Sequence, residues 1–278
     1  ATDQFLSDGD QSGENNFNRF NPSLGAVFVA SKWANVYANL ASNFETPTLT
    51  ELSANPNNLG GFNPDLQPQR SLNYELGTKL LVNDRVGFDL ALFQINLQDE
   101  LVPYQLANAP GRTFFRNAGK SKRRGVEAAL NVRLEEGLFL TLNYTFSDFI
   151  YQEYEANGVV FTGNAQPAVP RHHFFSILQW AHRSGFFVAG QMRNISSVFV
   201  NDANSVTNPG NTLCSIRAGH AFQLGKFWKI EPFAGINNIF GIEYTNNILL
   251  NAVGNRFFEP GAAQATYYGG LKLSWRKN

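Results

Sequence analysis

The most highly charged stretch of the sequence is a run of basic side chains between Arg112 and Arg124, which also contains Arg116 and Arg123. Guanidinium groups form strong, directional hydrogen bonds with carboxylates and phosphates. The run therefore predicts one of two kinds of contact: capture of an anionic ligand, or contact with lipid phosphates or water. The second interpretation is the more ordinary one, and both stay open at this point.

Catalytic chemistry is not indicated by any pattern in the chain. The histidines include the neighbours His172 and His173, whose side chains point to opposite faces of a strand and so cannot bind one metal ion together. A hydrolase would need a nucleophile, a histidine and an orienting acid or amide within reach, and no motif of that kind is present. We therefore expect no enzyme, and no catalytic residue, metal site or cofactor.

The composition is poor in charge and rich in aromatic residues. Among 278 residues, 22 are basic and 22 are acidic, a balance that gives no reason to expect a nucleic-acid partner. Charged residues make up 16% of the chain, against about 25% in an ordinary soluble domain, whereas aromatic residues reach 14%. No stretch offers the roughly 18 consecutive apolar residues of a transmembrane helix. This combination is expected of a β-barrel with an apolar outside and a polar inside.

Apolar and polar residues alternate with the period of a β-strand through most of the chain. Between Thr266 and Trp275, for example, Tyr267, Leu271 and Leu273 lie on the same face as Trp275. The pattern predicts an all-β, antiparallel fold with about eleven strands, many of them long enough to cross a bilayer obliquely. The expected strands are residues 24–31, 34–44, 71–82, 86–98, 122–134, 138–150, 172–182, 186–197, 213–224, 227–239 and 266–275.

The connections between these strands alternate in length, as in an outer-membrane barrel, where short turns face the periplasm and long loops face outside. Short turns are expected at 32–33, 83–85, 135–137, 183–185 and 225–226, and long loops at 45–70, 99–121, 151–170, 198–212 and 240–265. The C-terminus is then periplasmic, and the apolar strand faces contact lipid. The aromatic residues expected to form interfacial girdles are Tyr144, Phe146, Trp228, Tyr267 and Trp275.

The same arrangement places Arg133, Arg193 and Arg217 in the lumen, where we expect them to pair with carboxylates of a plug or to steer an anion. Tyr104 and Tyr244 fall in long loops and are candidates to line the mouth, although loop aromatics also serve as packing anchors. The candidate ligand-binding residues are Arg112, Arg116, Arg123, Arg124, Arg193, Arg217, Tyr104 and Tyr244.

Six stretches resemble sequence boxes of the TonB-dependent outer-membrane receptors and follow that family's order. They are SNFETPTLTEL (42–52), NPDLQPQRSLNYELGTK (63–79), NAGKSKRRGVEA (117–128), VPRHH (169–173), INNIFGIEY (236–244) and RFFEPGAAQATYYGGLKLSW (256–275). The chain departs from the family's patterns at Gln69, where Glu is usual, at Gly241, where Asp is usual, at Ala263–Gln264, which replaces Pro-Arg, and at Trp275, where Phe is usual. Each box is weak alone, but six in order are a specific match.

The resemblance implies a transporter built as a 22-stranded barrel with a plugged lumen. Residues 1–278 would then be the C-terminal half of its barrel domain. The plug and the TonB box are expected N-terminal to this chain, and the TonB complex would act through them. The implied function is energised uptake of a scarce nutrient, above all a ferric siderophore, across the outer membrane of a Gram-negative bacterium. Trp275 resembles the terminal signal read by the outer-membrane assembly machinery, and lipopolysaccharide and membrane lipid are the expected surroundings.

Three alternatives remain open from the sequence. The barrel could belong to a passive porin or an adhesin, with no energised plug. A receptor of this family could instead take cobalamin, haem or another substrate that is not a siderophore, because the iron chelate follows from the resemblance and not from the residues. A soluble β-sandwich would require a protein that is monodisperse without detergent.

Overall fold

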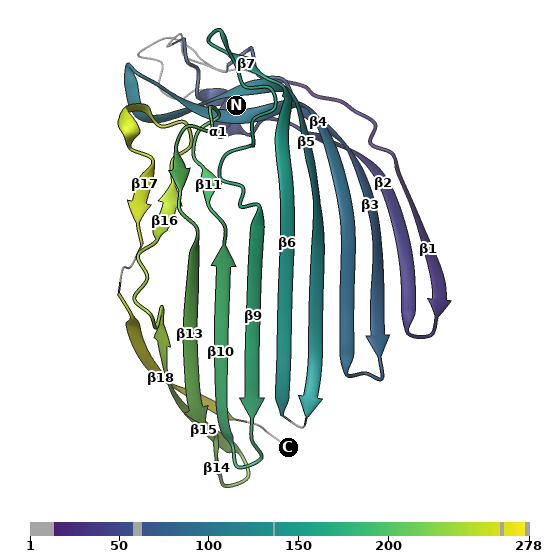
Figure 1. Ribbon diagram of the computed structural model, residues 1–278, viewed down its shortest axis with the longest axis vertical. Coiled ribbons are helices and arrows are strands. Elements are labelled where there is room, and N and C mark those ends of the chain that lie inside the picture. The colour runs from purple at the N-terminus through teal and green to yellow at the C-terminus, as the bar shows by residue number, and fades with distance from the viewer. Residues whose placement is uncertain (1–13, 58–62, 136, 262–263, 276–278) are drawn as a thin grey trace.

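A meander of long antiparallel strands makes up most of the chain in the computed structural model (Figure 1), which describes residues 14–57, 63–135, 137–261 and 264–275. Its strands are β1 (Ser23–Ser31), β2 (Ala34–Glu45), β3 (Gln69–Val82), β4 (Val86–Leu106), β5 (Ala109–Glu135), β6 (Leu138–Glu153), β9 (His172–Ala181), β10 (Phe186–Ile195), β13 (Asn211–His220), β14 (Phe222–Leu224), β15 (Trp228–Asn237) and β18 (Thr266–Trp275). Strands next to one another in sequence pair in one 12-stranded sheet, in which β14 and β18 both pair with β15. Since β13 and β14 are one strand interrupted at Ala221, the described residues make the eleven passes that the sequence predicts.

The predicted loop at residues 99–121 is wrong. Strands β4 and β5 continue through this segment and stay paired as far as Leu106 and Ala109. Elsewhere the strands begin and end within a few residues of the predicted positions. The β4–β5 hairpin is therefore an extended arm that rises beyond the other strands and bends over the end of the sheet (Figure 1).

Short turns gather at one end of the sheet, and β18 also ends there (Figure 1). The β3–β4 turn has positive φ angles at both central residues, Asn83 and Asp84, as a type I′ turn requires. Gly137 closes the β5–β6 turn with a φ of 79°, which glycine adopts at little cost. The long connections meet at the opposite end, so the alternation predicted from the sequence is confirmed except at 99–121, where the paired arm replaces a loop.

Small elements within the long connections pack together at that opposite end. They are α1 (Leu49–Ser53), the pairs β7 (Glu155–Ala156) with β8 (Val159–Val160), β11 (Val198–Phe199) with β12 (Thr207–Asn208) and β16 (Thr245–Ile248) with β17 (Phe258–Pro260), and the short 3-10 helix η2 (Val253–Asn255). A capping box between Thr48 and Glu51 begins α1. Within the described ranges, no helix has the length and apolar character needed to cross a membrane. We call residues 99–118, 151–170, 198–208 and 244–261 the cap.

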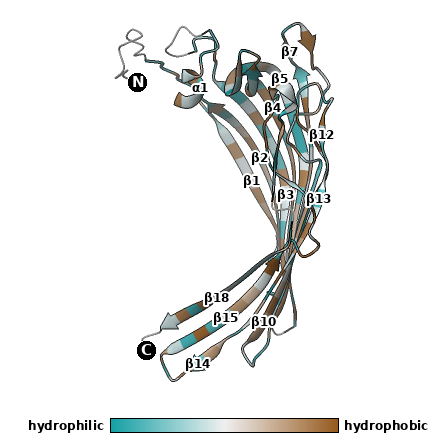
Figure 2. Cartoon of the chain, turned by 90° about the vertical axis from the view of Figure 1, so that its left-hand side faces the viewer, coloured by the Kyte–Doolittle hydropathy of each residue, from teal (hydrophilic) through white to brown (hydrophobic). Residues whose placement is uncertain are grey.

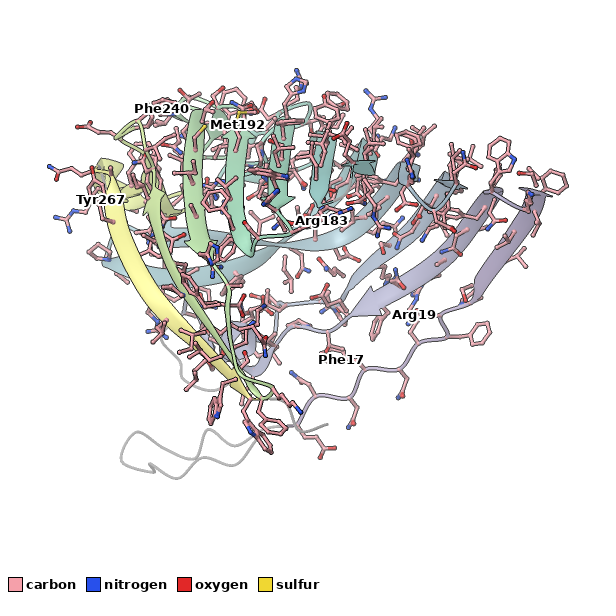
Figure 3. All side chains as sticks on the ribbon, turned by 90° about the horizontal axis from the view of Figure 1, so that it is seen from below. Phe17, Arg19, Arg183, Met192, Phe240 and Tyr267 are labelled. Atoms are coloured by element: carbon pink, nitrogen blue, oxygen red, sulfur yellow. The ribbon has the colours of Figure 1, made fainter. Side chains whose placement is uncertain are left out.

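The sheet is a single curved layer, which Figure 2 shows from the side and Figure 3 along the strands as an arc. Among the described strands, β1 pairs only with β2, and β18 pairs only with β15, so these two are the edges of the arc. A strand edge in lipid leaves backbone groups without partners. The arc is therefore the geometry of part of a barrel and not of a closed one.

The two faces of the arc differ as the alternation predicts. On the convex face, Tyr267 and Leu271 are 75% and 65% exposed, and Met192 points away from the concave side (Figure 3). On the concave face Tyr37 donates a hydrogen bond of 2.7 Å to Glu75. The tryptophans of the chain all fall at the short-turn end, namely Trp33, Trp180, Trp228 and Trp275. Tryptophan is enriched at membrane interfaces, so this end lies at one surface of the bilayer.

On the concave face, aromatic rings lie close against glycines of neighbouring strands. A Cβ atom at Gly219 would lie 2.4 Å from a ring carbon of Phe187 and 2.5 Å from the Pro232 carbonyl oxygen. The same close approach pairs Tyr37 with Gly77, Phe93 with Gly125, Tyr268 with Gly235 and Phe233 with Gly270. Covering a strand glycine with an aromatic ring pins the register of adjacent strands. These pairs therefore hold the wall of the lumen in one alignment.

Candidate functional site

A buried carboxylate, Asp202, holds the cap together. Its oxygens accept hydrogen bonds from the hydroxyls of Tyr151 at 2.9 Å and Tyr154 at 3.0 Å, and from the side-chain amide of Asn251 at 3.0 Å. Asp202 is only 2% exposed, and a buried carboxylate is tolerated only when it is fully hydrogen-bonded or paired. Asp202 thus joins cap segments that are far apart in the sequence.

Asn251 extends this network to the β4–β5 arm. Its side-chain oxygen accepts from the backbone N–H of Asp202 at 2.9 Å, and its amide also donates to the Pro103 carbonyl at 3.0 Å. On the other side, Asn164 donates to the carbonyl of Asp202 at 2.7 Å. The cap is therefore a connected structure with its own polar core and not a set of independent loops.

The two tyrosines of this core lie beyond the lipid-facing part of β6, and both stay neutral over a wide pH range. Burial raises the pKa of Tyr151 and of Tyr154 well above the usual range of a phenol, and the negative charge of Asp202 raises both further. Arg116 opposes this effect at Tyr154, because its guanidinium lowers the pKa. Both phenols therefore serve as hydrogen-bond donors to Asp202.

Arg116 stacks between tyrosines at the edge of the polar core. Its guanidinium carbon lies 4.5 Å from the ring centre of Tyr104 and 5.6 Å from that of Tyr154. Its Nε donates to the Tyr154 hydroxyl at 2.8 Å, and a terminal nitrogen lies 3.9 Å from an oxygen of Asp202. The planar guanidinium suits both stacking and directional hydrogen bonding.

Tyr104 and Arg116 also line an open cavity of about 250 Å³, together with Phe161, Asn251 and Phe257. Tyr104 stands on the arm beyond the lipid-facing strands, and burial raises the pKa of its phenol. The cavity combines aromatic faces, one cation, amide groups and Asp202, whose carboxylate lies beside Arg116. It can hold a small group that stacks on Tyr104 and accepts hydrogen bonds.

A second buried carboxylate, Glu100, fixes the base of the arm. It pairs with Arg123 and accepts hydrogen bonds from Ser121 and Gln166. Gln166 in turn accepts from the Nε of Arg123 at 3.1 Å. Arg123, Ser121 and Gln166 together satisfy the Glu100 carboxylate. Arg123, which contacts both Glu100 and Gln166, therefore links the arm to the segment 164–168.

The alternation of β4 breaks just before Glu100. Asp99 has a positive φ of 58°, which is uncommon for a residue with a side chain. Gln98 faces Lys120 across the ladder, whereas Glu100 contacts Ser121 and Arg123, which lie on the opposite face of β5. The left-handed residue therefore turns Glu100 toward the concave side, and this inversion separates the lipid-facing strand from the arm.

The predicted basic run is divided by the structure. Arg116 and Arg123 are held by buried carboxylates in the cap, whereas Arg112 sits near the tip of the arm with its guanidinium 5.0 Å from the ring centre of Phe114. Arg124 points outward, pairs with Asp148 at 2.7 Å and is 58% exposed. The structure therefore brings Arg116 and Tyr104 together but places Arg124 on the outer surface.

The predicted lumen arginines share the concave face. The ladder aligns Arg133 with Phe139, Phe139 with Gln179, Gln179 with Ala189 and Ala189 with Arg217, so these side chains point the same way. Arg193 lies four residues along β10 from Ala189 and therefore on the same face.

Arg217 stacks on an aromatic ring of the lumen wall. Its guanidinium carbon lies 4.0 Å from the ring centre of Phe233. Within the described residues, Arg193 and Arg217 form no ion pair. Their positive charges therefore act on the lumen itself.

Tyr244 lies apart from the polar core. Its backbone carbonyl accepts from the Gly261 N–H at 2.8 Å, and its ring covers Gly261 so closely that a Cβ there would lie 2.6 Å from it. It lines another open cavity, of about 510 Å³, with Asn208, Thr245 and Phe258. The predicted ligand residues are thus spread over the cap, the outer face and the lumen.

Sequence reasoning missed the residues that organise the cap. Asp202 and Glu100 were not among the candidate ligand-binding residues. The segment NDANS (201–205) that holds Asp202 reads as an ordinary turn, and Asn251 lies 148 residues from its partner Pro103. No local spacing reveals such a contact.

Comparison with known proteins gives the family. Residues 1–239 match the family described as TonB dependent receptor-like, beta-barrel. This chain belongs to that family. It is therefore part of an outer-membrane β-barrel receptor and not of an enzyme, and the fold class, the location and the family resemblance expected from the sequence are confirmed.

Individual relatives show how much of such a receptor the chain represents. A 178-residue segment is 25% identical to the iron-regulated outer membrane virulence protein of Vibrio cholerae serotype O1, covering 58% of this chain and 26% of that protein. The chain thus spans about a quarter of that relative's length.

Among solved structures, the siderophore receptor PiuA from Acinetobacter baumannii superposes with a TM-score of 0.70 at 17% identity, over 90% of this chain and 35% of PiuA. The copper transporter OprC superposes with a TM-score of 0.71 at 15% identity, over 91% of this chain and 38% of OprC. At these identities the likeness establishes the fold.

Proposed function

We propose that this chain is the C-terminal part of a receptor that binds an anionic iron chelate, such as a ferric siderophore, on its cap and passes it into the lumen. The observation that carries the proposal is the arrangement of the cap above the lumen. Tyr104 and Arg116 line a cavity in the cap, and Arg193 and Arg217 continue the positive charge along the concave face. A ferric siderophore offers aromatic or carboxylate groups that this combination of rings and cations can recognise.

The similarities to an iron-regulated outer-membrane protein and to a siderophore receptor support iron as the cargo. The similarity to a copper transporter keeps another metal chelate as the second candidate, and cobalamin and haem remain alternatives. We further propose that import is driven by TonB acting on a plug that lies outside this chain. A passive porin or an adhesin would need no such plug.

Growth on defined iron sources tests the proposal. A strain that lacks the full-length gene is expected to lose growth on one ferric siderophore and to regain it when the gene is restored, with growth on ferrous iron as the control. Unchanged growth of the deletion strain on every iron chelate, with impaired uptake of a copper chelate instead, would overturn iron as the cargo.

Energy coupling is tested separately in a strain that lacks TonB. Uptake through the receptor is expected to stop in that strain while binding of the chelate to the cell surface persists. Uptake that continues without TonB would instead identify a passive porin, and binding without any uptake in either strain would identify an adhesin.

A further inference from the structure

The cavity of about 510 Å³ beside Tyr244 lies at the base of the β16–β17 hairpin. Its lining includes Glu243 and Tyr244, where β16 begins, and Phe258 and Pro260 of β17, with Pro209 after the end of β12. Sites for small molecules typically have volumes of about 300–1,000 Å³. The cavity is therefore large enough for a small organic ligand, and we call it the Glu243 cavity.

The charge of this cavity comes from one carboxylate. Among the described residues that line it, Glu243 alone carries a formal charge. Its side chain is exposed, and it forms no ion pair within the described part of the chain. A carboxylate without an internal partner attracts a cation and repels an anion. The cavity therefore favours a positively charged ligand over an anionic chelate.

Aromatic and proline rings supply the apolar surface around this carboxylate. The Tyr244 ring lies against Gly261, and Phe258 is 42% exposed. The faces of aromatic rings are negative, and cages of such rings recognise quaternary ammonium groups. Pro209 and Pro260 add apolar surface without a backbone N–H that could bind an anion. Rings and carboxylate thus select for the same kind of ligand, an organic cation.

Buried amides hold the chain on both sides of Glu243. Before it, Asn238 accepts a hydrogen bond from the Ile242 N–H at 2.9 Å and donates one to the Ile242 carbonyl at 2.9 Å. After it, the Thr245 hydroxyl donates to the side-chain oxygen of Asn208 at 2.8 Å. Both asparagines are less than 9% exposed. The backbone that carries Glu243 is therefore fixed before a ligand arrives, which reduces the cost of binding.

We propose that the Glu243 cavity binds a small organic cation, a quaternary or protonated amine, with its charge beside Glu243 and its alkyl groups against Tyr244 and Phe258. A bare metal ion prefers several oxygen ligands, whereas the described lining supplies one carboxylate and apolar rings. The proposal does not depend on which chelate the receptor imports, and the site is separate from the Tyr104–Arg116 cavity.

Ligand-observed NMR of the full-length receptor in a neutral glycoside detergent tests the cavity with two probes. They are choline and its neutral analogue, in which carbon replaces the quaternary nitrogen and the shape is retained. We expect choline to bind roughly 10-fold more tightly than the analogue. Glu243→Gln is expected to weaken choline binding several-fold. Phe258→Leu is expected to reduce the preference for choline, because leucine keeps the apolar contact but has no ring face.

Glu259→Gln is the matched control. Glu259 follows Phe258 on β17, so its side chain points to the opposite face, and it accepts a hydrogen bond from Asn247 at 3.1 Å, which Gln can also accept. This control is expected to bind choline like the unaltered receptor, and heat-modifiable migration on gels checks that all the proteins are folded.

The proposal is overturned if Glu243→Gln binds choline as tightly as Glu259→Gln does, or if Phe258→Leu keeps the full preference for choline. Equal binding of the neutral analogue would also overturn it, because apolar contact alone would then explain binding. A full-length receptor that binds no choline would do the same, since another part of the receptor would then fill the cavity.

Discussion

At the scale of single residues, Asp202 determines whether the cap is one unit. Replacing Asp202 by Ala leaves the Tyr151 and Tyr154 hydroxyls and the Asn251 amide without their acceptor. Each buried polar group left unsatisfied costs about 1–3 kcal/mol. We expect Asp202→Ala to speed proteolytic cleavage of the cap and amide exchange in it at least tenfold, with the barrel still heat-modifiable on gels.

The matched control for this change is Glu155→Ala, which removes an exposed carboxylate from the same cap. It is expected to leave cleavage and exchange unchanged. Equal protection of the cap in Asp202→Ala and in Glu155→Ala would show that Asp202 does not organise this region.

The same tyrosines give the cap a defined response to alkaline pH. Their pKa values are raised in the folded cap, mainly by burial, so their contribution to stability is complete below the pKa of an unfolded tyrosine, about 10. It is lost as the pH rises through the higher, folded pKa values, because the unfolded cap then releases protons more readily. Exchange in the cap, corrected for intrinsic rates, is expected to increase between about pH 9 and about pH 12.

Tyr154→Phe tests the origin of this response. It removes one titrating hydroxyl, so the alkaline increase in exchange should be smaller than in the unaltered receptor. An identical alkaline profile in Tyr154→Phe would assign the response to other groups.

At the scale of the elements, rings over glycines align the strands. A methyl group at Gly219 would clash with the Phe187 ring and with the Pro232 carbonyl oxygen. Overpacking of this kind typically costs about 1–3 kcal/mol. We expect Gly219→Ala to lower the thermal unfolding temperature of the receptor in detergent.

Gly190→Ala is the matched control, since nothing lies within 4 Å of a Cβ built at Gly190 on the adjacent strand β10. Its unfolding temperature is expected to equal that of the unaltered receptor within error. A fall of the same size in both variants would mean that lost glycine flexibility, and not the ring contact, controls stability.

The strands also show how much of the structure the sequence predicts. Period-two alternation predicted β3, β6 and β18 within a few residues, because each has one face in lipid and one toward the lumen. The β4–β5 arm was missed because its pairing continues where alternation stops, at Asp99, which inverts the face of β4. The arginines were found as residue types, but Asp202, which holds Arg116, lies in another connection, and Glu100, which holds Arg123, lies on the paired strand β4, so neither leaves a local pattern.

At the scale of the whole molecule, one sheet separates the lipid on its convex face from the lumen on its concave face, and the cap lies at one end of both. The convex face is apolar below the level of Arg124, the cap covers one end, and the concave face carries cationic side chains such as Arg193 and Arg217 together with carboxylates such as Glu75. A concave wall of low dielectric focuses the field of such charges and raises the local concentration of an anion. The proposed path of an anionic chelate thus runs from the Tyr104–Arg116 cavity toward Arg193 and Arg217.

Removing lumen charge should therefore slow uptake in a salt-dependent way. We expect Arg193→Gln with Arg217→Gln to lower the initial rate of uptake of an anionic ferric chelate several-fold at low ionic strength. The difference should shrink as salt is added, because the screening length falls from about 30 Å at 0.01 M to about 8 Å at 0.15 M. Radiolabelled iron uptake by intact cells, with the receptor level checked by immunoblotting, measures both effects.

Charge at the far end of the molecule provides the comparison that makes this result specific. Lys32→Gln with Lys226→Gln removes the same net charge from two short turns and leaves the concave face unaltered. If uptake depends on the local field of the lumen, this pair should behave like the unaltered receptor at every salt concentration. Equal slowing by the two pairs would point to net charge, and slowing by the arginine pair that salt does not change would point to a direct contact with the chelate.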